Sequence, residues 1–62
     1  MEKIKLSNGV EKSFITEEND TWKFFYCDTY EEASELSLTL TEIGNHCEVD
    51  DNSHGWFVRV KK

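Results

Sequence analysis

Two thiols and two imidazoles are the side chains of this chain that could hold a metal ion. They belong to Cys27, Cys47, His46 and His54, and zinc prefers ligands of these two kinds. No Cys-x-x-Cys or His-x-x-x-His pair occurs, and His46 and Cys47 are neighbours whose side chains would point to opposite faces of a strand. We therefore expect structural cysteines, surface histidines, no metal site and no other cofactor.

A group of carboxylates near His54 could perform a different kind of chemistry. Glu48, Asp50 and Asp51 lie close to His54 in the sequence, and such a set can bind a divalent cation or act in acid–base hydrolysis. Carboxylates in a turn are first of all turn formers, and no glycine-rich phosphate-binding loop occurs. The sequence therefore predicts no enzyme and no catalytic residue, with a metal-dependent nuclease or hydrolase as the second alternative.

Charge is distributed unevenly along the chain. Thirteen acidic and seven basic residues give a net charge of −6, and residues 17–51 hold eleven of the acids with one base, Lys23, which leaves −10 on that segment. A field of one sign disfavours nucleic acid and anionic lipid and steers association with a basic partner. We expect no direct contact with nucleic acid or membrane, and a larger basic protein as the partner.

The elements that would position these residues follow from periodicity and turn signals. Alternating polar and apolar residues, an Asn-Gly pair and an aromatic run indicate strands over 2–6, 10–16, 22–27, 46–50 and 56–60, the third of them central. Thr29 and Glu32 form a capping box that begins a helix over 30–43, and Gly44 suits its end. The predicted fold class is α+β, in the order β-β-β-α-β-β, with one helix packed on a small, mainly antiparallel twisted sheet.

Two stripes run along the predicted helix. At 100° per residue, one narrow stripe is apolar and predicts the core face; it comprises Ala33, Leu36, Leu40 and Ile43. The opposite stripe places one leucine among three glutamates; it comprises Glu31, Glu35, Leu38 and Glu42. Like charges four residues apart do not stabilise a helix. This stripe is either an ordinary solvated face or a contact surface with an apolar anchor.

The leading hypothesis is a non-enzymatic inhibitor that blocks a basic, nucleic-acid-binding surface of a larger partner. Carboxylates along a helix can occupy sites that otherwise hold phosphates, as in small phage-encoded anti-CRISPR or anti-defence proteins, and the analogy is one of class. We expect the partner to contact the glutamate-and-leucine stripe of the helix. A possible second acidic patch comprises Glu17, Glu18 and Asp20.

Aromatic residues on both faces of the predicted sheet suggest the first alternative. One helix covers only one face of a sheet, so the other aromatic set is exposed or covered by a second chain. This predicts a possible homodimer, a regulatory or assembly module in which Phe25 and Phe57 form the contact. In that case the acids serve only to keep the protein in solution.

Length and composition limit the organisation of the chain. Sixty-two residues without a linker or repeat indicate a single domain over 1–62. No apolar run is long enough to span a bilayer, so we expect a cytoplasmic protein, in the host cytoplasm if the chain is phage-encoded. Two cysteines are too few for a disulfide scaffold and suit a reducing compartment.

Overall fold

The computed structural model describes residues 1–62 as five strands and one helix, and the predicted α+β class and element order are confirmed. The elements are β1 (Glu2–Lys5), β2 (Glu11–Glu18), β3 (Trp22–Cys27), α1 (Tyr30–Glu42), β4 (Cys47–Asn52) and β5 (Gly55–Lys61). All neighbouring strands pair antiparallel, in the spatial order β1-β2-β3-β5-β4. The aromatic strand β3 therefore lies at the centre, as predicted.

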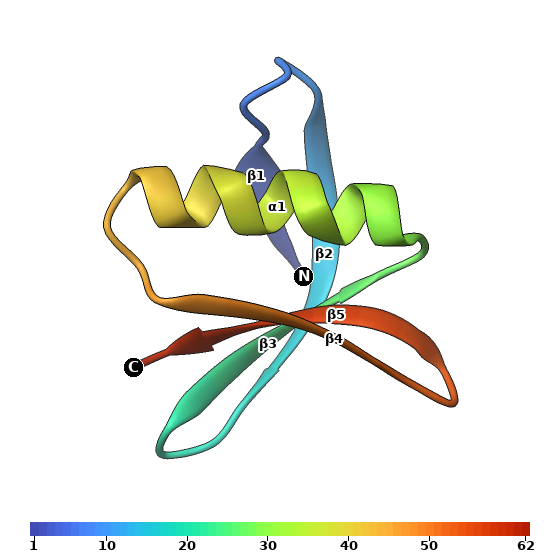
Figure 1. Ribbon diagram of the computed structural model, residues 1–62, viewed down its shortest axis with the longest axis vertical. Coiled ribbons are helices and arrows are strands. Elements are labelled where there is room, and N and C mark those ends of the chain that lie inside the picture. The colour runs from blue at the N-terminus through green and yellow to red at the C-terminus, as the bar shows by residue number, and fades with distance from the viewer.

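Strand β2 is shared between two parts of the sheet. Its first half, up to Phe14, pairs with β1, and its second half, from Ile15, pairs with β3. The β1–β2 hairpin consequently rises beside the helix instead of extending flat from the sheet (Figure 1). Its turn uses a left-handed glycine, Gly9, with φ of 91°. The strand runs to Glu18, beyond the predicted end at residue 16, because Glu17 and Glu18 pair with Phe24 and Lys23.

The two ends of α1 are defined by local hydrogen bonds. Thr29 is the N-cap, and its Oγ1 accepts a hydrogen bond of 3.1 Å from the Glu32 N–H. The Glu32 carboxylate accepts one of 3.3 Å from the N–H of Asp28, so the predicted capping box reaches one residue further back than expected. Gly44, with φ of 102°, follows the C-cap, and the N–H of Asn45 bonds back to the carbonyl of Leu40 at 3.1 Å.

Helix α1 covers one face of the sheet, and the core lies between them (Figure 1). Nine buried apolar side chains form this core; they belong to Leu6, Phe14, Phe25, Cys27, Ala33, Leu36, Leu40, Val58 and Val60. The prediction that Ile43 belongs to the core stripe is wrong, since its side chain is 73% exposed. Ile43 is the C-cap residue, so the chain leaves the helix where the stripe would otherwise continue.

The single helix is too short and too polar to cross a membrane. The outer strands of the sheet, β1 and β4, each pair on one side only.

Two leucines on α1 allow a matched test of this packing. Leu36 is completely buried, whereas Leu38, two residues later, is 51% exposed. We expect Leu36→Ala to lower the free energy of unfolding by about 2–5 kcal/mol, because it leaves a cavity under the helix. Leu38→Ala should change it by less than about 0.5 kcal/mol. Urea denaturation followed by circular dichroism measures both, and equal losses would contradict the assigned helix orientation.

Candidate protein-binding face

The thiols and imidazoles do not gather into a site. No group of three or more Cys, His, Asp or Glu side chains has a geometry that could hold a metal ion. Cys27 and Cys47 are both free thiols. His46 lies beside Glu48, with Nε2 to Oε2 at 3.4 Å, while His54 is in the exposed β4–β5 turn.

Neither thiol is placed to act as a nucleophile. Burial raises the pKa of Cys27 to about 12, with a smaller contribution from the Glu32 carboxylate. Burial also raises the pKa of Cys47. Because the thiolate is the reactive form, a raised pKa makes both thiols react more slowly at neutral pH than a free cysteine does.

The acidic side chains divide into those with a cation partner and those without. Six carboxylates form ion pairs: Glu2 with Lys23, Glu11 with Lys3, Asp28 and Glu32 with Lys12, Glu18 with Lys62, and Glu48 with Arg59. The remaining seven have no lysine or arginine within 4.0 Å; they are Glu17, Asp20, Glu31, Glu35, Glu42, Asp50 and Asp51. Seven of the eleven acids in residues 17–51 therefore have no basic partner in the folded protein.

Three of the unpaired carboxylates lie on α1, around an apolar side chain. Glu31, Glu42 and Leu38 are exposed on the side of the helix that faces away from the sheet. Glu35 is half-buried at the flank of the helix that faces the β1–β2 turn, where its Oε2 accepts a weak hydrogen bond of 3.4 Å from the Ser7 hydroxyl. The predicted stripe therefore exists as one surface, with Glu35 at its edge. We call it the acidic helix face: Glu31, Glu35, Leu38 and Glu42.

The β1–β2 turn is fixed to this edge of the helix. The Ser7 N–H donates to Thr39 Oγ1 at 2.9 Å, and the Thr39 hydroxyl is also 2.9 Å from the carbonyl of Glu35. An open groove of about 560 Å³ lies between the turn and the first half of α1. Glu31 and Glu35 line it together with the exposed side chains of Val10 and Tyr30. The paired Lys12 and Glu32 side chains line it as well. The groove therefore combines two unpaired carboxylates, one ion pair and apolar edges.

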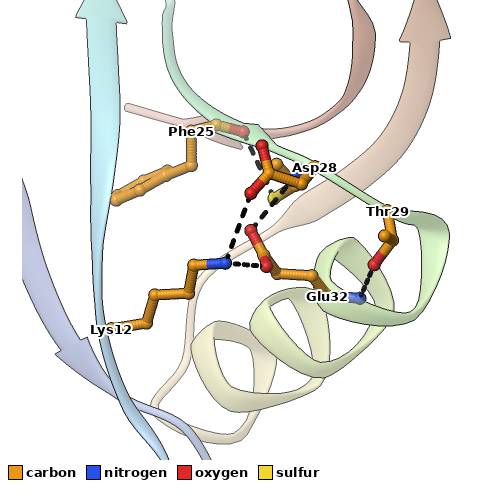
Figure 2. Close-up of polar contacts among 6 residues, drawn as sticks. Lys12, Phe25, Asp28, Thr29 and Glu32 are labelled. Carbon is orange, nitrogen blue, oxygen red and sulfur yellow. Dashed lines mark hydrogen bonds and ion pairs between the residues drawn. The ribbon is translucent and has the colours of Figure 1, made fainter.

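A partly buried ion pair connects β2 to the start of α1. Lys12 extends from β2 to the carboxylate of Glu32, and its Nζ lies 3.6 Å from Asp28 Oδ2 (Figure 2). The Glu32 hydrogen bond, opposed in part by burial, raises the pKa of Lys12. Thr29 caps the helix beside this cluster (Figure 2). Because Lys12 neutralises Glu32, Glu31 is the one carboxylate in the first turn of the helix without a basic partner.

The structure does not bring the second acidic patch together. Glu17 and Glu18 are neighbours in β2, so their side chains point to opposite faces. Glu18 forms an ion pair with Lys62 at 2.8 Å, which lowers the pKa of Glu18. Asp20 is exposed in the β2–β3 turn. These three residues are not one surface.

Phe25 and Phe57 do not lie on the same face of the sheet, which corrects the predicted dimer contact. Phe25 pairs with Val58 and is only 3% exposed beneath α1, where it packs edge-on against Phe14 with ring centroids 6.3 Å apart. Phe57 instead pairs with Tyr26 on the uncovered face. Phe25 is therefore a core residue and is unavailable to a second chain.

Of the aromatic residues on the uncovered face, only Phe57 was assigned to a site from the sequence. The aromatic side chains concerned are Trp22, Phe24, Tyr26 and Phe57. Strand alternation places the three from β3 together, but it does not say which face the helix covers. A signal was present in β5, where Phe57 alternates in phase with the charged Arg59 and Lys61 and therefore belongs to the face that meets solvent.

No protein-family model, no curated protein and no solved structure matches the chain. The surfaces described above are therefore the features that bear on its function.

The thiol environments predict slow alkylation. We expect iodoacetamide at neutral pH to modify Cys27 more slowly than Cys47, because Cys27 is buried and Cys47 is half-buried. Both should react at ordinary rates once the protein is unfolded in urea. Mass spectrometry of digested samples gives the two rates, and fast modification of folded Cys27 would contradict its placement in the core.

A second prediction concerns acid stability. The hydrogen bond from Arg59, followed by that from His46, lowers the pKa of Glu48 from its ordinary value of 4.5. Above the ordinary, unfolded-state pKa, the ion pair therefore contributes its full stabilisation to the folded protein. This stabilisation is lost as the pH falls through the lower pKa that Glu48 has in the folded protein. Glu48→Gln should therefore lower the melting temperature at neutral pH and reduce its decline below about pH 4.5. The control Glu42→Gln removes a carboxylate without an ion pair and should leave the profile parallel to that of the unmodified protein.

Proposed function

We propose that this protein is a non-enzymatic binding protein whose acidic helix face docks on a basic surface of a larger, nucleic-acid-binding partner and keeps nucleic acid away from it. The observation that carries the proposal is the lack of any cation beside Glu31, Glu35 and Glu42. Five of the seven lysine and arginine side chains pair with acids of the strands, with Asp28 or with Glu32 of the first helical turn.

Ion pairing within the domain does not account for the acidic helix face, and only Glu31 of its carboxylates lies in the first turn, where an acid favours the helix dipole. Helix α1 contains four glutamates and no basic residue, so no stabilising pair between residues four apart can form, and Glu31 and Glu35 repel each other. Leu38 is half-exposed at the centre of the face. An apolar side chain ringed by charges resembles the arrangement of binding surfaces, in which a few central side chains supply most of the affinity.

The groove beside the helix supports a basic partner in particular. A lysine or arginine side chain entering the groove would meet the carboxylates of Glu31 and Glu35. The Tyr30 ring, held against Trp56 with centroids 4.9 Å apart, borders the same space. A guanidinium group can stack on such a ring while it binds a carboxylate.

The experiment has two stages. The protein is first used to capture binding partners from a lysate of its host, and the captured proteins are identified by mass spectrometry. Each purified candidate is then tested for binding to its own DNA or RNA in the presence of increasing amounts of this protein. We expect a basic, nucleic-acid-binding protein whose nucleic acid is displaced.

A matched pair of charge variants tests the assigned face. The variant Glu31→Gln, Glu35→Gln, Glu42→Gln should keep the fold and weaken partner binding by at least about tenfold at low salt. The control Glu17→Gln, Asp20→Asn, Asp51→Asn makes the same change in net charge away from the helix and should have a much smaller effect. Equal affinities for the helix variant and the unmodified protein would refute the proposal.

A further inference from the structure

No helix or strand of this chain covers the face of the sheet opposite α1 (Figure 1), and the strand register places a group of aromatic side chains on that face. We define the open face by the side chains that the strand register places there: Ile15, Glu17, Trp22, Phe24, Tyr26, Glu48, Asp50, Phe57, Arg59 and Lys61. The Phe24 and Phe57 rings are 5.8 Å apart, and the Tyr26 and Phe57 rings are 6.3 Å apart. Ile15, beside Tyr26, is 60% exposed.

The charges of the open face differ from those of the molecule as a whole. Three acids and two bases leave it nearly neutral, although the chain carries −6. Arg59 and Lys61 lie beside the Trp22 ring, 5.2 and 5.1 Å from its centroid, and Arg59 also pairs with Glu48. Neither a polyanion nor a basic protein matches such a mixed surface, because each would meet charges of its own sign.

Two charges of opposite sign lie at different ends of the open face. Lys61 pairs with Trp22 at one end, whereas Asp50 pairs with Phe57, which precedes Lys61 by four residues in β5. Neither Lys61 nor Asp50 has an ion-pair partner within the chain. A second copy, rotated by 180° about an axis that crosses the strands between the two sheets, brings its Asp50 end over the Lys61 end of the first. The surface is therefore complementary to itself.

We propose that the open face is the interface of a symmetric homodimer, in which the aromatic rows of two copies pack face to face and Lys61 of each copy pairs with Asp50 of the other. This arrangement covers the aromatic surface and gives Lys61 and Asp50 a partner, while Glu17 of the open face stays unpaired. It is independent of the acidic helix face, which lies on the other side of the sheet.

The dimensions of the sheet indicate how strong this dimer is. Four strands about 4.8 Å apart, with about six residues of 3.3 Å each, give a footprint of about 400 Å² per copy. Two such footprints are smaller than the roughly 1,200–2,000 Å² of stable interfaces. We therefore expect a reversible dimer with a Kd of about 10⁻⁵ to 10⁻³ M.

Sedimentation equilibrium at concentrations from about 10 μM to about 1 mM tests the dimer directly. The average mass should rise from 7.3 kDa toward twice that value. Phe57→Glu should raise the dissociation constant at least about tenfold, and the control Leu38→Glu, on the acidic helix face, should leave it unchanged. A constant monomer mass at the highest concentration, or a dimer that Leu38→Glu dissolves and Phe57→Glu does not, would overturn the proposal.

A charge exchange tests the orientation with variants that do not threaten folding, because Lys61 and Asp50 are both exposed. Lys61→Glu and Asp50→Lys should each weaken the dimer, and the double variant should restore it. Recovery of dimer affinity in the double variant requires that Lys61 of one copy contacts Asp50 of the other. As a competing occupant, an oligothymidylate should neither bind the open face nor shift its amide signals in NMR spectra, and binding by a protein that stays monomeric would contradict the proposal.

Discussion

The organisation of this domain depends on one constraint: a single helix can cover only one face of the sheet. Every fully buried apolar side chain of the strands faces α1, and the alternate side chains of β3 and β5 meet solvent. Because the chain has no second helix, the aromatic side chains Phe24 and Phe57 are only partly buried, although their chemistry resembles that of the core. The same constraint sends the outer side of α1 to solvent, and both candidate surfaces follow from it.

Features set by neighbours in sequence could be predicted, and those set by distant segments could not. Thr29 and Gly44 define the helix ends through local hydrogen bonds and backbone conformation, so the sequence indicates them directly. The location of Phe25 depends on which face the helix covers and on the pairing of β3 with β5, which no local pattern specifies. Ile43 fits the helical period, but the helix ends at that residue, and periodicity cannot show this. Glu35 lies at the edge of its stripe because the β1–β2 turn packs there.

The uneven charge along the chain explains which carboxylates are neutralised. Most of the bases lie on strands or at their ends, so they meet acids from neighbouring strands, as Arg59 meets Glu48 and Lys3 meets Glu11. Helix α1 has no base of its own, and only Lys12 of β2 reaches it. Folding therefore removes charge from the sheet more effectively than from the helix. The excess of acids along residues 17–51 of the sequence is thereby concentrated, in the folded protein, on the acidic helix face.

The acidic helix face and the open face differ in physical character. Because they lie on opposite sides of the molecule, both can be occupied at the same time. The acidic helix face is charged and curved, which suits rapid, salt-sensitive association with a basic partner. The open face is flat, aromatic and nearly neutral, which suits self-association through burial of apolar area. Since α1 lies on the opposite side of the sheet (Figure 1), two copies joined through their open faces would present their helices outward in opposite directions. A partner with two basic sites, or two neighbouring partners, would then be held by both helices, and the second contact would form at the high effective concentration that linkage provides. Weak self-association and weak charge contacts would then strengthen one another.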